Sequence, residues 1–133
     1  MRHRMAGKKL NRNTHQRKAL FRGLISSLFI NGRLETTEMR AKAVQRLAEK
    51  LITKARVGSL HSQRLVAAFL QNRLAIEKAV KVWGPLFKSR AGGFTRIIRL
   101  GRRRGDDAMK ARLEFTAPPP TEKDAKDTDA KKK

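Results

Sequence analysis

Residues 94–115 read FTRIIRLGRRRGDDAMKARLEF, and this stretch decides the fold because the hydrophobic period changes at its start. Its second half, residues 109–115, alternates apolar with charged residues, which is typical of a strand with one buried face. In its first half, Phe94, Ile98 and Leu100 occupy alternate positions together with Arg96, so all four would point to the same face of a strand. The loop Gly101 to Ala108, GRRRGDDA, is rich in turn-forming residues, so the stretch predicts a β-hairpin with a long basic tip.

Upstream of the hairpin, apolar residues recur with the period of a helix. The first predicted helix starts at Thr14, which can act as its cap, and stops at Asn31 and Gly32. The second begins near Thr37 and ends before Gly58. Two shorter helices follow, at 60–70 and 73–83, and the pair Gly84-Pro85 is expected to close the last one.

The sequence therefore predicts an α+β fold in which about four helices pack on a small antiparallel sheet. Arg33 to Thr36 is a possible third short strand. We expect a basic extended arm at 1–13, a single globular domain at 14–116 and a disordered tail of mixed charge at 117–133. Phe21, Phe29, Phe69, Trp83 and Phe87 fall on apolar faces and are expected in the core.

The net charge of the chain indicates the class of molecule that it binds. The chain carries a formal charge of +22 on 133 residues, and the first 34 residues hold nine Lys and Arg with no carboxylate before Glu35. Such a segment repels itself and needs a polyanion beside it, and nucleic acid fits best because each pairing of a cation with a phosphate releases a counterion. An anionic membrane is the weaker alternative, and with no apolar run of about 18 residues and no signal-peptide pattern we expect a soluble, cytoplasmic protein.

Catalysis and metal chemistry are not expected. There is no cysteine, so thiolate zinc sites and cysteine nucleophiles are excluded. His3, His15 and His61 are scattered, and Asp106 and Asp107 follow three arginines, where a turn-forming and charge-balancing role is expected. We therefore predict no enzyme, no cofactor and no small-molecule substrate.

Two features of the carboxyl-terminal third point to RNA contact. Arg102, Arg103 and Arg104 form the densest charge run, and guanidinium groups suit phosphate and base edges. Gly92 and Gly93 allow the main chain to approach a phosphate closely, although a flexible entry into the hairpin explains them equally well. Few aromatic residues are available for base stacking, so recognition of shape and phosphate is expected.

A set of motifs resembles a known family. The opening MRHR, the segment Leu10-Asn11-Arg12-Asn13, the pair Thr36-Thr37 and RAGGFTRI at 90–97 are similar to the bacterial large-subunit ribosomal protein of the L-seventeen family. The resemblance covers residues 1 to about 116 in order. It implies a structural constituent of the large ribosomal subunit that binds and stabilises large-subunit ribosomal RNA near the exit of the polypeptide tunnel, beside neighbouring ribosomal proteins, with a role in assembly.

The resemblance and the charge pattern together give a set of candidate RNA-binding residues. In the arm and first helix they are Arg2, His3, Arg4, Lys8, Lys9, Asn11, Arg12, Asn13, Arg17 and Arg22. Around the hairpin they are Arg90, Gly92, Gly93, Thr95, Arg96, Arg99, Arg102, Arg103 and Arg104.

Two other classes remain open from the sequence. A nucleoid-type DNA-binding protein would also be small, basic and α+β, but would place an apolar wedge at its ribbon tip, where this chain has glycines, charges and Ala108. An enzyme acting on RNA would have to use Asp106, Asp107 or the histidines.

Overall fold

A computed structural model describes residues 8–118 and contains a three-stranded antiparallel sheet. Strands β1 (Arg33–Thr37), β2 (Thr95–Arg102) and β3 (Met109–Phe115) lie in the order β1-β3-β2, so the last strand is central. The central position of β3 explains its clean alternation: Ala111, Leu113 and Phe115 are buried, and the residues between them are not.

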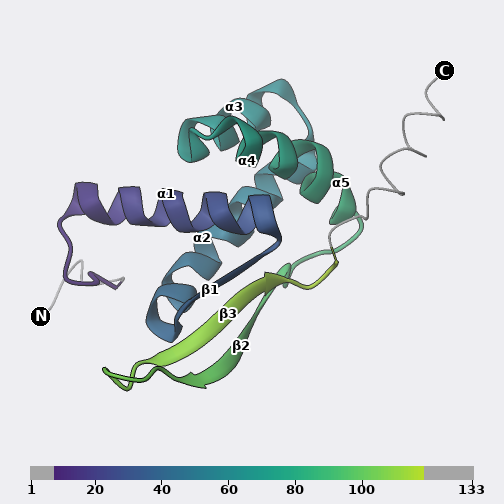
Figure 1. The fold of residues 1–133 in the computed structure, drawn as a ribbon. Coiled ribbons are helices and arrows are strands. Elements are labelled where there is room, and N and C mark those ends of the chain that lie inside the picture. Colours follow the sequence, from purple (N-terminus) through teal and green to yellow (C-terminus); the bar gives the residue numbers. More distant parts are fainter. Residues whose placement is uncertain (1–7, 119–133) are drawn as a thin grey trace, which may run out of the picture.

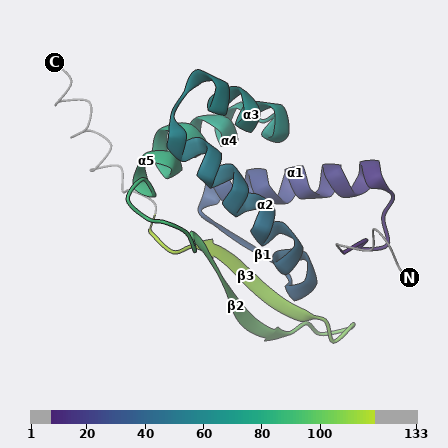
Figure 2. The ribbon, with the colours of Figure 1, turned by 180° about the vertical axis from the view of Figure 1, so that it is seen from behind.

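Four helical segments lie on one side of this sheet (Figure 1, and from behind in Figure 2). They are α1 (Thr14–Asn31), α2 (Glu38–Val57), α3 (Leu60–Leu70) and a continuous run composed of α4 (Arg73–Lys78), a π-helical turn η1 (Ala79–Trp83) and α5 (Gly84–Leu86). The predicted α+β class, the four helices and the third strand are thus confirmed. Within residues 8–118 no helix combines the length and apolarity needed to cross a membrane.

The first helix is capped one residue earlier than the sequence suggested. Asn13, not Thr14, is the N-cap: its side chain accepts a hydrogen bond from the backbone N–H of Gln16 at 2.9 Å, and the Gln16 side chain accepts from the N–H of Asn13. This reciprocal pair satisfies two donors that the start of a helix would leave free. Gly32 ends the helix in the left-handed conformation, as predicted.

The pair Gly84-Pro85 does not end the last helix, which is a correction to the sequence interpretation. The chain continues through it to Leu86 because the turn before it widens: the N–H of Gly84 bonds the carbonyl of Ala79, five residues back. Pro85 has no N–H, and its ring would clash with a carbonyl one regular turn earlier, so a wider turn accommodates it.

Phe94, Ile98 and Leu100 occupy alternate positions in the sequence, but they do not form one buried face of a strand. Phe94 is buried, but it precedes β2 and enters the core from the loop. Within β2 the inward residues are Thr95 and Ile97, while Ile98 and Leu100 are each 37 % exposed. A register shift between Arg99 and Gly101 bulges the strand, and β2 extends to Arg102, so the tip is shorter than predicted.

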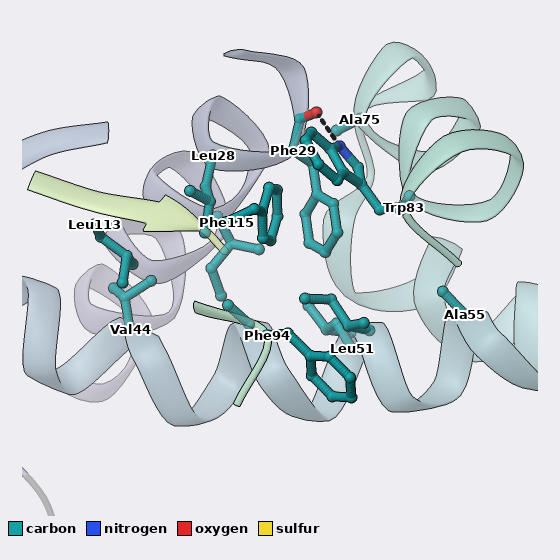
Figure 3. Close-up of a cluster of buried hydrophobic side chains, with 14 of the residues drawn as sticks. Leu28, Phe29, Val44, Leu51, Ala55, Ala75, Trp83, Phe94, Leu113 and Phe115 are labelled. Atoms are coloured by element: carbon teal, nitrogen blue, oxygen red, sulfur yellow. Dashed lines mark hydrogen bonds between the residues drawn. The ribbon is translucent and has the colours of Figure 1, made fainter. Parts of the chain in front are cut away.

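Trp83 is one of the largest buried side chains of the core (Figure 3). Its ring centroid is 4.1 Å from that of Phe115 in β3 and 6.2 Å from that of Phe87. Its indole N–H donates to the carbonyl of Phe29 at 2.9 Å, which satisfies one of the free carbonyls at the end of α1. Lys78 reaches the next carbonyl, that of Ile30, at 2.6 Å. Phe29, Trp83 and Phe87 are buried as predicted, whereas Phe21 and Phe69 are only partly buried.

Gly84 brings two helical segments into close contact. A Cβ atom at this position would lie 2.8 Å from the carbonyl oxygen of Ala55 in α2. Gly23, in the exposed part of α1, has nothing within 4 Å of the same added atom.

We therefore expect opposite effects from the same substitution at these two glycines. Gly84→Ala should lower the free energy of unfolding by about 1–3 kcal/mol, because backbone must shift to make room. Gly23→Ala should raise it by up to about 1 kcal/mol, because alanine favours a helix interior. Urea denaturation of both variants and the wild type measures the two values, and equal destabilisation would contradict the close contact.

Candidate nucleic-acid interface

The carboxylates divide the surface into two parts. Of the seven Asp and Glu residues between 8 and 118, five lie on the sheet, in its hairpin loop or at the first residue of α2. The only other two in that range are Glu49 and Glu77. From residue 8 to the end of α1 there is no carboxylate, so the positive charge of this segment has no acidic neighbour in sequence.

The acid-free surface is formed by residues 8–13 and the first half of α1. Residues 13–16, 18 and 19 are exposed, and the first fully buried side chain of the helix is Ile25. Figure 1 shows this end of α1 projecting beyond the other helices. Arg17 donates to the carbonyl of Arg12 at 3.1 Å, and Arg22 donates to the side chain of Gln71 at 3.1 Å. Both arginines are therefore held without losing their charge.

The arm is not extended where the structure describes it. Leu10 and Asn11 have positive φ angles of 53° and 50°, and the N–H of Arg12 bonds the carbonyl of Lys9, so the chain makes a tight turn. Lys8 then lies 3.5 Å from the sulfur of Met39, near the start of α2. The expected extended arm is corrected for residues 8–12. Arg2, His3 and Arg4 lie outside the described residues.

The double glycine belongs to a loop organised by Arg90. Arg90 donates to the carbonyl of Gly92 at 3.1 Å and to the hydroxyl of Thr116 at 2.8 Å. Gly93 has a φ of +64°, which disfavours other residues, and both glycines are exposed. Thr95 is buried and its hydroxyl donates to Glu49 at 3.0 Å, so its side chain serves the fold.

Most arginines of the sheet are paired with carboxylates, and Arg33 is the exception within residues 8–118. Arg96 contacts Glu114 at 2.6 Å, and Arg99 contacts Glu38 at 2.9 Å. At the hairpin tip Arg102 and Arg103 pair with Asp107 and Asp106, as the predicted charge-balancing role requires, and within the described residues only Arg104 of the run has no such partner. The tip therefore carries less free charge than its sequence suggests.

Hydrogen bonds from cations perturb three of these carboxylates. A hydrogen bond from Arg112 lowers the pKa of Glu35, and bonds from Lys42 and then Arg99 lower the pKa of Glu38. The pKa of Asp106 falls to about 2, mainly through Arg103. Each carboxylate is thus stabilised in its charged form.

These shifts set the direction of an acid effect on stability. Because the folded pKa values lie below the unfolded values of 3.8 and 4.5, their contribution is complete above about pH 5 and is lost as the pH falls toward 2. We expect the urea midpoint to fall over this range, and to fall less in the variant E35Q/E38Q/D106N. An identical pH dependence in the variant would contradict this assignment.

Sequence reasoning missed the cations of α2 and β3. Arg40, Arg46 and Lys50 lie on α2, and Lys110 is one of the outward-facing residues of β3. The alternation of β3 marks Lys110 as outward, but the sequence alone does not bring it close to α2. Among the described residues no group of three His, Cys, Asp or Glu side chains could hold a metal ion.

Comparison with known proteins places the chain in a family. The profile described as ribosomal protein L17 matches residues 20–116. A protein of Dictyoglomus turgidum named "Large ribosomal subunit protein bL17" is 51% identical over 115 residues, which cover 86% of this chain and 99% of the relative. The protein of the same name from Gemmatimonas aurantiaca is 48% identical over 115 residues, covering 86% and 98%.

A third relative aligns with almost the whole chain. The protein of that name from Thermodesulfovibrio yellowstonii is 43% identical over 132 residues, covering 98% of this chain and 99% of its own length. The family match spans α1 from its second turn through β3, which includes all the remaining helices and strands. The chain therefore belongs to the ribosomal protein L17 family.

Proposed function

We propose that this chain is a structural constituent of the large ribosomal subunit that binds and stabilises large-subunit ribosomal RNA near the polypeptide exit tunnel and contributes to subunit assembly. The observation that carries the RNA-binding part is the acid-free surface of residues 8–13 and the first half of α1. Family membership supports the ribosomal part, because relatives that cover nearly their full length carry the name "Large ribosomal subunit protein bL17". The position at the tunnel, the neighbouring ribosomal proteins and the assembly role follow from the family resemblance.

The mechanism is charge neutralisation on a rigid frame. RNA segments packed against one another repel through their phosphates, and Lys and Arg side chains between them reduce that repulsion. The capped first half of α1 presents Arg17 and Arg22 at fixed positions. Lys8, Lys9 and Arg12 before it form no ion pair within the described residues, so RNA supplies their counter-charge on binding, which links binding to assembly.

Neither rival explains the chain as well. As a member of a ribosomal protein family, the chain is a ribosomal protein and not an enzyme. A nucleoid-type protein would use an apolar wedge at its ribbon tip, and here residues 103–107 form a turn closed by two ion pairs.

Sedimentation tests the ribosomal assignment directly. Large subunits separated on a magnesium-containing sucrose gradient and washed in high salt should retain about one copy of this chain per particle. Release of the chain by the wash, or its migration with DNA, would overturn the proposed function.

Deletion of residues 1–12 tests the basic arm. The deletion removes five Lys and Arg but leaves Asn13 and Gln16 to cap α1. We expect affinity for large-subunit ribosomal RNA to fall on the order of tenfold or more, with a shallower salt dependence, and incorporation into particles to decrease. Deletion of residues 121–133 is the matched control, because its four acids and five lysines nearly cancel. Unchanged affinity without the arm would show that the arm does not contact RNA.

A further inference from the structure

An open hollow of about 210 Å3 lies between the start of α2, strand β1 and the hairpin. It is lined by Glu35, Thr36, Thr37, Arg40, Arg103 and Lys110. The lining comes from separate parts of the sequence, and neither Arg40 nor Lys110 belongs to the candidate set considered above. The volume is several times that of a water molecule, so a hydrated anion can enter.

The charges around the hollow do not cancel. Glu35 is held by Arg112, whose guanidinium lies 2.7 Å from its carboxylate, and Arg103 is held by Asp106. Arg40 and Lys110 have neither an ion pair nor a side-chain hydrogen bond within residues 8–118. Glu35 attracts Lys110 at longer range, but three cations and one carboxylate line the open space, so its charge remains positive.

Thr37 also lines the hollow, and its hydroxyl has no protein partner within residues 8–118. Thr37 is the N-cap of α2, but its side chain makes no capping hydrogen bond, and it lies opposite Lys110 in the sheet, so the two side chains share one face. Thr36 lies opposite the buried Ala111, and its side chain belongs to the other face. A hydroxyl can donate a hydrogen bond to an anion whose charge is balanced by nearby cations. Two cations with one hydroxyl are a donor set that suits a phosphate.

We propose that this hollow binds a phosphate group of the RNA backbone, through Arg40 and Lys110 as cations and Thr37 as a hydroxyl donor. The proposal rests on the RNA-binding function proposed above. The hollow is open rather than enclosed, which allows the backbone of a polymer to enter and leave on either side. Lys8 of the acid-free segment contacts Met39, the residue before Arg40, so one RNA segment can pass from the arm to the hollow.

Two charge variants separate this site from general attraction. R40A/K110A removes both cations of the hollow, and R46A/K50A removes two cations from the next turns of α2, both exposed and outside the hollow. With purified large-subunit ribosomal RNA, we expect R40A/K110A to bind on the order of tenfold more weakly, with a salt slope smaller by about 1.5 to 2, and R46A/K50A to change much less. Circular dichroism and the thermal midpoint of each variant establish that it is folded.

A third variant changes no charge. Thr37→Val keeps the β-branched shape at the end of strand β1 and removes only a hydroxyl that makes no capping hydrogen bond. We expect a loss of affinity of a few-fold with an unchanged salt slope, because the lost contact is a hydrogen bond rather than a counterion-releasing pair.

The other possible results of these binding measurements would each contradict either the phosphate site or the proposed function. If the wild type binds ribosomal RNA and both charge variants lose affinity equally, the hollow is not a phosphate site, although the proposed function stands. Wild-type affinity in T37V would show that the hydroxyl makes no contact. If the wild-type chain does not bind the RNA, the proposed RNA-binding function fails and the phosphate site with it.

Discussion

The hydrogen bond from the indole of Trp83 to the carbonyl of Phe29 is the constraint on which the rest of the structure depends. It is buried, so neither partner has water as a substitute, and loss of the donor would leave a carbonyl unsatisfied at the end of a helix. The same indole ring packs on Phe115 of the central strand. One side chain thus joins the end of α1, the π-helical turn and the sheet. Since α1 is fixed at its carboxyl-terminal half, its basic first half is free to project away from the core.

In this arrangement some cationic side chains are paired with carboxylates and others are not. On the sheet and its hairpin, carboxylates pair with arginines, so this part of the chain can fold without a polyanion. The segment from residue 8 to the end of α1 has no carboxylate and relies on a partner for neutralisation. The fold therefore does not depend on a polyanion, and the acid-free surface stays available for the RNA contact that we propose.

Local sequence signals predicted most of the fold. The limits of α1, α2 and α3 agree with the sequence to within a residue or so, because helical period and glycine stops act over a few positions. The role of Gly84 could not be predicted, since its constraint is the carbonyl of Ala55, which only packing brings close. The pairs Arg99 with Glu38 and Arg112 with Glu35 span 61 and 77 positions, so their partners were equally hidden. The ion pairs of the hairpin tip, in contrast, join residues only three and five positions apart, and the sequence did predict that Asp106 and Asp107 balance charge there.

The ion pairs change what the sheet arginines can do, but they do not remove those arginines from binding. A guanidinium has five N–H donors, and a carboxylate that accepts one or two of them leaves others for a phosphate. The Nε and Nη2 atoms of Arg96 both contact the carboxylate of Glu114, which fixes the flexible arginine side chain before any ligand arrives. Ordering such a side chain on binding would otherwise cost part of the affinity. The sheet thus presents few but positioned donors, whereas the acid-free segment presents uncompensated charge, and folded RNA can use the first for register and the second for attraction.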